Sequence, residues 1–325
     1  IIKVDGKDIL PLTANETVKL LKGKEGTKVD VEVVREGKKE PMKFTLTRAK
    51  IKLEMVESKM LENNIGYVSL LRFGNHVGAE VEKAIKDLQA KGMKGLILDL
   101  RSNPGGSLQE AQDISSLFVK EDLIVYLKYK NGQQRNYNRT SKNLGNFPLI
   151  VLTNKASASA SEILAAAIKE GAGGQIIGTK TYGKGTVQSV VDITDNSELK
   201  YTNAKWLTPK GNWIHKEGVT PTKEVNLPDY AFLKIIDAKE TLKVGSVSQN
   251  VLSAETILKG LGYSVTVDGY FDEGTKDAVK SYQQKEGLTA TGEVDEESAQ
   301  KLMDSVRALI QQNDTQYQAA KELLK

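Results

Sequence analysis

The chain has 325 residues, of which 39% are hydrophobic and 27% charged, as in an ordinary globular protein with two or three domains. Its 46 basic and 42 acidic residues give a net charge of +4, and because the two signs are interspersed, nucleic acid is not an expected partner. The absence of cysteine excludes a cysteine nucleophile, a disulfide framework and a thiolate metal site, and no apolar run reaches the roughly 18 residues of a membrane span.

Residues 1–48 have the pattern of a small β-rich domain. The first residues resemble the middle of a strand, so we expect the chain to begin inside a domain. A helix opened by Thr13 follows, and alternating valines predict a hairpin of strands over 28–35 and 42–48, joined by a turn over 36–39. The spacing I-x-x-V-x-G and then G-x-x-V-x-V-x-V-x-R-x-G resembles the C-terminal half of a PDZ domain. An unrelated β-rich module is the alternative.

Residues 49–228 alternate strands with helices. This alternation, with near-continuous apolar strands, predicts an α/β core whose functional site lies at the carboxyl ends of parallel strands. We expect strands over 65–71, 95–100, 124–129, 148–153, 175–178 and 186–191, and helices over 77–90, 108–118 and 162–168.

Two loops in this core follow strands and carry residues suited to acyl chemistry. The stretch SASASE (157–162) lies between the strand over 148–153 and a helix, where a serine hydroxyl can face a cleft beside the free N–H groups of the helix's first turn. Ser157, Ser159 and Ser161 are equally placed by this pattern alone. In NPGG (103–106) the paired glycines can aim backbone N–H groups at a ligand, although an ordinary turn explains them equally well.

A serine nucleophile needs a base, and Lys184 is the candidate. It lies between Gly183 and Gly185 and leads directly into a predicted strand. Because side chains alternate along a strand, Lys184 and Gln188 share one face, so the Gln188 amide can hold the amine in place. A lysine acts as a base when burial against apolar walls favours its neutral form. The alternative is an exposed lysine in a glycine-rich loop.

Histidine is scarce in this chain. A Ser-His-Asp triad would have to use His76 or His215, and we interpret both as surface or packing residues. No paired spacing of metal ligands occurs, so neither a metal site nor a cofactor is predicted.

Three motifs occur in the order found in the carboxy-terminal processing proteases. They are LDLRSNPGG (98–106), SASASE (157–162) and YGKGTVQ (182–188). The resemblance covers residues 1 to about 228 and implies an α/β protease core of crotonase-like ββα units with a PDZ domain. One departure lies outside these motifs, where Thr222 replaces the family's usual aspartate.

The resemblance assigns roles that the residue pattern left open. It implies that Ser159 is the nucleophile, Lys184 the general base and Gln188 the residue that orients the lysine. The oxyanion hole would combine the N–H of Ala160 with that of Gly105 or Gly106. Ser157 and Ser161 would then cap the helix or pack against it.

The last third of the chain predicts a small helical domain. We expect a linker over 229–249, helices over 254–261, 275–284 and 296–303 within a domain over 250–304, and an amphipathic helix over 306–325 in the C-terminal segment 305–325. Paired D-G-x-F and T-G-x-V units resemble the peptidoglycan-binding domain of cell-wall enzymes. Wall binding and a purely structural or dimerising role both remain open, and the tail is a candidate assembly element.

The resemblance to the carboxy-terminal processing proteases implies an endopeptidase that cleaves proteins near a flexible C-terminus through an acyl-enzyme. The expected partners are protein substrates, with peptidoglycan and a second copy as further candidates. The expected location is outside the cytoplasm, secreted or membrane-anchored, on the cell-wall side. Two alternatives are an inactive wall-associated PDZ scaffold and acyl transfer on a small thioester or amide, although no coenzyme-binding motif supports the latter.

Overall fold

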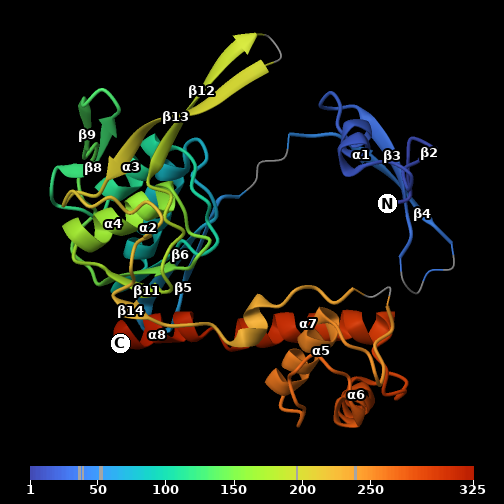
Figure 1. Cartoon of the computed structure of the whole chain (residues 1–325). Helices are drawn as coiled ribbons and strands as arrows, with labels where there is room; N and C mark the ends of the chain where they lie inside the picture. Colours follow the sequence, from blue (N-terminus) through green and yellow to red (C-terminus); the bar gives the residue numbers. More distant parts are fainter. Residues whose placement is uncertain (36–37, 39, 51–53, 195–196, 238–239) are drawn as a thin grey trace. The chain divides into compact units, whose positions relative to one another are not determined.

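The computed structural model describes the whole chain except residues 36–37, 39, 51–53, 195–196 and 238–239 (Figure 1). It divides into two compact units, Ile1–Glu54 and Met55–Lys325. Within the described residues, no helix combines the length and the apolar character needed to cross a bilayer.

The first unit is a four-stranded sheet with one helix. Its elements are β1 (Lys3–Val4), β2 (Lys7–Asp8), α1 (Ala14–Leu21), β3 (Lys28–Val33) and β4 (Met42–Thr47), in the sheet order β2-β1-β3-β4. Thr13 opens α1 as predicted, because its side chain and that of Glu16 form a capping box. The predicted hairpin is β3 with β4, and its turn over 36–39 falls mostly outside the described residues.

The second unit contains a six-stranded mixed sheet. Its strands are β5 (Val56–Met60), β6 (Ile65–Leu70), β7 (Gly95–Asp99), β10 (Leu149–Thr153), β11 (Gln175–Gly178) and β14 (Lys223–Glu224). The order is β14-β11-β10-β7-β6-β5, and every pair is parallel except β5 with β6, which the short helix η1 (Glu62–Asn64) joins. The α/β prediction is therefore confirmed for this sheet.

Side chains alternate between the two faces of this sheet. Leu96, Leu98 and Val151 face a large core formed with α2 (Val77–Ala90), α3 (Leu108–Ser116) and α4 (Ala160–Gly171). Ile97 and Ile150 face the opposite side, where they pack with residues of α8 (Thr315–Leu323). Both faces are thus covered, which explains why the parallel strands are continuously apolar.

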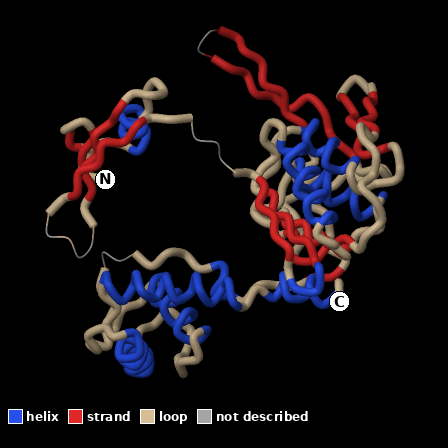
Figure 2. The backbone as a smooth tube through the Cα atoms, turned by 180° about the vertical axis from the view of Figure 1, so that it is seen from behind, coloured by secondary structure: helices blue, strands red, loops and turns tan. Residues whose placement is uncertain are grey.

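A second, antiparallel sheet has the order β12-β13-β8-β9. It is formed by β8 (Leu123–Tyr129), β9 (Gln134–Asn138), β12 (Thr186–Thr194) and β13 (Ser197–Leu207), and the β12–β13 hairpin extends from the core in Figures 1 and 2. The strand predicted over 124–129 therefore forms, but outside the parallel sheet. Strand β9 was not predicted, because it is a polar strand on which only Tyr137 is even half-buried.

The C-terminal region is helical, with α5 (Gln249–Gly260), α6 (Glu273–Glu286) and α7 (Glu296–Gln312) around one apolar core. Asp272 caps α6 by accepting the N–H of Thr275, and Asp295 caps α7 by accepting that of Ser298. The similar D-G-x-F and T-G-x-V sequences therefore precede two equivalent helix starts. The segment 229–249, predicted as a linker, packs against the helical domain. It contains η2 (Asp229–Phe232), and Ile236 and Leu242 are buried in the helical core.

The tail departs from the single helix predicted over 306–325. Helix α7 continues through position 306, where the tail helix was predicted to begin, because Val306 is buried in the helical core. It ends at Gln312. The separate helix α8 then packs on β10 and β11, so its apolar face is used within the chain and is not available for assembly.

Arg101, which follows β7, ties this tail to the core. Its guanidinium contacts Asp99, and also Asp314 at 2.8 Å and Gln316 at 3.2 Å. Burial lowers the pKa of Arg101, but the hydrogen bond and charge of Asp99, with those of Asp314, outweigh burial and raise it above its usual value. The start of α8 is therefore fixed to the loop that carries Gly105 and Gly106.

The role of α8 can be tested at Ala320, which is fully buried against the sheet. Ala320→Asp places a charge in this apolar contact, so we expect it to lower the free energy of unfolding by about 3 kcal/mol or more in urea denaturation. Glu322→Ala on the exposed side of the same helix is the control and should change it by less than about 0.5 kcal/mol. Equal stability of the two variants would show that α8 does not support the core.

Candidate active site

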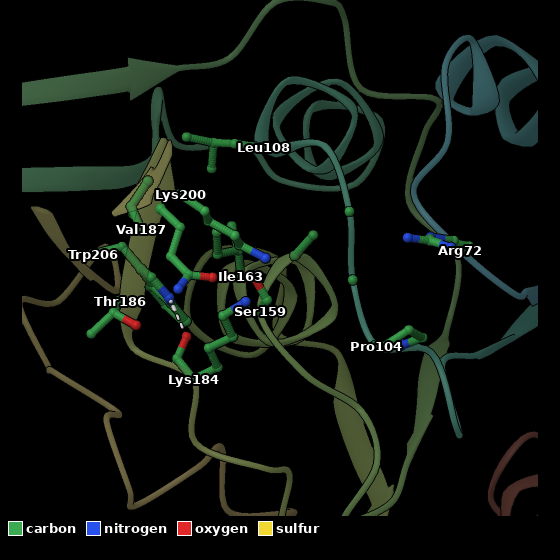
Figure 3. Close-up of a pocket in the computed structure, with 14 residues that line it drawn as sticks. Arg72, Pro104, Leu108, Ser159, Ile163, Lys184, Thr186, Val187, Lys200 and Trp206 are labelled. Carbon is green, nitrogen blue, oxygen red and sulfur yellow. Dashed lines mark hydrogen bonds between the residues drawn. The ribbon is translucent and has the colours of Figure 1, made fainter. Parts of the chain in front are cut away.

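A pocket of about 340 Å³ opens at the carboxyl ends of the parallel strands (Figure 3). Four neighbouring strands, β6, β7, β10 and β11, each lead into a loop that contributes to it, as expected for an α/β sheet. It is lined by Arg72, Pro104, Gly105, Gly106, Leu108, Ser159, Ala160, Ile163, Lys184, Thr186, Val187, Gln188, Lys200 and Trp206. All six residues that the sequence analysis assigned to catalysis line this one pocket.

Ser159 occupies a sharp turn between β10 and α4. Its backbone has φ 56° and ψ −113°, a conformation that residues other than glycine rarely adopt. Such a strained turn between a strand and a helix exposes a side chain above the end of a sheet.

The other two serines are occupied elsewhere. Ser157 donates its hydroxyl to the carbonyl of Leu100 at 2.8 Å, and Ser161 donates to that of Asn103 at 2.9 Å. Both are fully buried and hold the loop after β7 against the turn. Of the three candidates, Ser159 alone lines the pocket.

The buried carboxylate of Glu162 joins the serine turn to the Lys184 loop. One oxygen accepts the N–H of Ser159 at 2.7 Å and that of Lys184 at 2.8 Å. The other accepts the Thr181 hydroxyl and the Gly183 N–H, both at 2.6 Å. Charge-assisted bonds of this kind are strong, so a single side chain sets the separation of the two loops.

Two tryptophans hold the carbonyl groups of the same loop. Trp206 donates its indole N–H to the carbonyl of Lys184 at 2.8 Å, which Figure 3 marks, and Trp213 donates to that of Gly185 at 2.8 Å. A Cβ on Gly185 would lie 2.8 Å from the Trp213 indole nitrogen, so this position requires glycine. Together with Glu162, these bonds fix the backbone on both sides of Lys184.

Lys184 is half-buried, and Figure 3 shows its side chain directed toward Ser159. Gln188 also lines the pocket, but no hydrogen bond joins its amide to Lys184, both residues being described. A register shift between Val187 and Gln188 interrupts the strand, so these two consecutive residues both reach the pocket.

The glycine loop packs directly on the serine turn. A Cβ on Gly105 would lie 2.9 Å from Ala160 N, so a side chain there would push the two segments apart. The Gly105 N–H donates to the Asn103 side chain at 2.9 Å, whereas the exposed Gly106 N–H has no acceptor within the described chain. Ala160 begins α4, and its N–H has no intrahelical acceptor.

Neither histidine belongs to the pocket. His76 is exposed at the start of α2, and His215 stacks on Trp213 with ring centroids 5.1 Å apart. Among the described residues, no cluster of three or more histidine and acidic side chains has the arrangement of a metal site.

The sequence profile of peptidase family S41 matches residues 64–225, and that of a peptidoglycan-binding domain matches residues 247–302. The chain is 42% identical to the carboxy-terminal processing protease CtpA of Bacillus subtilis, over all of this chain and 70% of that protein. It is 37% identical to CtpB of the same bacterium, over 98% of this chain and 68% of that protein.

The chain belongs to peptidase family S41. Among solved structures, the photosystem II D1 C-terminal processing protease matches with 30% identity and a TM-score of 0.50. That match covers 70% of this S41 peptidase and 62% of the other chain, so the present sequence spans less than two thirds of that protein. The resemblance inferred from the three motifs is confirmed at the level of the family.

Sequence reasoning missed three residues of this S41 site: Glu162, Trp206 and Trp213. The spacing S-x-x-E before an apolar helix is a capping signal that could have indicated Glu162. The tryptophans gave no such signal, because their acceptors lie more than 20 residues away in the chain.

Glu162→Gln tests the link between the two loops. The amide has only one acceptor oxygen, and its NH₂ group opposes N–H donors, so buried bonds are lost. We expect peptidase activity to fall by at least about a hundredfold and the free energy of unfolding by roughly 3 kcal/mol, measured by peptide hydrolysis and urea denaturation. Glu121→Gln is the control, because this exposed glutamate forms no hydrogen bond or ion pair within the described residues. Wild-type activity in Glu162→Gln would refute this role.

Trp213→Phe removes one indole N–H from the Lys184 loop and keeps an aromatic ring. Trp213 is 45% exposed, so we expect little change in stability. Losing one neutral hydrogen bond should lower kcat about tenfold and leave KM nearly unchanged. Tyr182→Phe, which removes an exposed hydroxyl from the same loop, should behave as wild type. A changed KM with normal kcat would contradict a role in positioning the loop.

Proposed function

We propose that this S41 peptidase is a serine endopeptidase that cleaves proteins near a flexible C-terminus. The observation that carries the proposal is the meeting of Ser159, Lys184 and the Ala160 N–H in one pocket, with the lysine directed toward the serine. The names of the Bacillus subtilis relatives support C-terminal processing as the activity.

In the proposed mechanism the hydroxyl of Ser159 attacks the scissile carbonyl while the neutral amine of Lys184 takes its proton. The N–H groups of Ala160 and Gly106 stabilise the resulting oxyanion. Collapse expels the amine of the leaving peptide, which receives the proton from Lys184 and leaves an ester on Ser159. A water molecule, deprotonated by the same amine, then hydrolyses this acyl-enzyme.

Two further assignments belong to this proposal. Of the two glycines, Gly106 is the better oxyanion donor, because the Gly105 N–H is already bonded to Asn103. Gln188 orients the lysine amine by forming its hydrogen bond when substrate is present, since catalytic contacts often tighten only then.

The proposed fold details extend beyond the family assignment. Residues 1–48 would form the C-terminal half of a PDZ domain, supported by the capped helix α1 and the order β2-β1-β3-β4. The core would be crotonase-like, with β5, β6 and α2 forming one ββα unit. An intact PDZ domain would bind the substrate's tail or control access to the pocket.

The helical domain suggests where the enzyme works. Its match to a peptidoglycan-binding family supports a location on the cell-wall side, with the enzyme secreted or membrane-anchored. Cosedimentation with purified peptidoglycan tests this. A homodimer is also proposed, with an interface that does not use the buried face of α8.

Ser159→Ala and Lys184→Ala test the mechanism. Each should reduce cleavage of casein, an unstructured protein, by at least about a thousandfold, because the nucleophile or its base is lost. Circular dichroism should remain unchanged, and Ser141→Ala is the control, because this exposed serine lies outside the pocket and forms no hydrogen bond within the described residues. Full activity in either variant would overturn the Ser–Lys assignment. A wild-type chain without any activity would favour the scaffold alternative.

A further inference from the structure

The charged side chains of the pocket are all basic. They are Arg72, Lys184 and Lys200, and among the residues that the structure describes no aspartate or glutamate lines it. Lys184 has a proposed role as the base. The other two cations have no role in the mechanism described so far.

Arg72 and Lys200 are exposed, and neither side chain forms an ion pair or a hydrogen bond within the described residues. This separates them from cations such as Arg101 and Lys276, whose charges are matched by nearby carboxylates. In Figure 3 their nitrogen-bearing ends point into the pocket from opposite sides. Two unmatched positive charges therefore face the space in which a substrate must lie.

The two cations are fixed by different elements. Arg72 follows β6, and the next residue, Phe73, is buried and accepts the Ser107 N–H at 2.9 Å, which fixes Arg72 beside the glycine loop. Lys200 lies on β13, opposite Val190 of β12. Their convergence on Ser159 is thus a consequence of the fold.

We propose that Arg72 and Lys200 bind a carboxylate of the substrate and so favour acidic sequences near the scissile bond. This inference rests on the proposed function. The carboxylate is the anion of an unmodified polypeptide, and a guanidinium recognises it with two parallel hydrogen bonds. The group is either the side chain of an aspartate or glutamate or the terminal carboxylate of the cleaved chain.

The experiment compares kcat/KM for paired quenched-fluorescence peptides. One series replaces glutamine by glutamate at each position around the scissile bond in turn, and a second pair differs only in a C-terminal carboxylate or carboxamide. We expect one pair to show a preference of about tenfold for the acid, which decreases as salt is raised. The series in which it occurs identifies the source of the carboxylate.

In the Arg72→Gln/Lys200→Gln double variant the acid-to-amide ratio of kcat/KM should fall to nearly one. Lys128→Gln is the control, because this exposed lysine of the same sheet does not line the pocket and should keep the wild-type ratio. If the wild type cleaves casein but its acid-to-amide ratio of kcat/KM is near one for every peptide pair, this inference is overturned. If the wild type cleaves neither the peptides nor casein, the proposed function itself is overturned.

Discussion

The arrangement of the pocket depends on one buried carboxylate. Glu162 accepts N–H groups from Ser159, Gly183 and Lys184 and the hydroxyl of Thr181, so it joins two loops that follow neighbouring parallel strands. A buried charge is tolerated because each oxygen is bonded to more than one donor. The same bonds hold Ser159 in a backbone conformation that it would not adopt alone.

The surrounding structure restricts these loops further. Ser157 and Ser161 bond to carbonyls of the loop after β7, and the two tryptophans bond to carbonyls of Lys184 and Gly185. The geometry of the pocket is therefore set largely by hydrogen bonds between backbone groups and side chains, which leave the two loops little freedom to move. A site fixed in this way is prepared before substrate arrives.

The C-terminal tail takes part in the same construction. Helix α8 covers the second face of the parallel sheet, and Asp314 contacts Arg101 at the end of β7. The helical domain of α5, α6 and α7 is formed by the part of the chain between β14 and α8. The peptidase core thus includes the last residues of this chain.

Much of this could be predicted from local pattern. Continuous apolar runs predicted β7 and β10, and periodic spacing predicted α2. The three motifs predicted which residues line the pocket. The rest depends on contacts between distant residues. The polar strand β9 and the break between α7 and α8 follow from tertiary packing, and the choice among three serines depends on which hydroxyls find carbonyls. The bulge at Gln188 is likewise a property of strand pairing.

We infer that Glu162 holds Ser159 and Lys184 in a reactive pair. Labelling by a fluorophosphonate, with the modified residue located by mass spectrometry, tests it most directly. We predict rapid labelling of Ser159 in the wild type and labelling at least about a hundredfold slower in Lys184→Met and Glu162→Gln. Labelling of Ser157 or Ser161, or an unchanged rate at Ser159 in both variants, would contradict it.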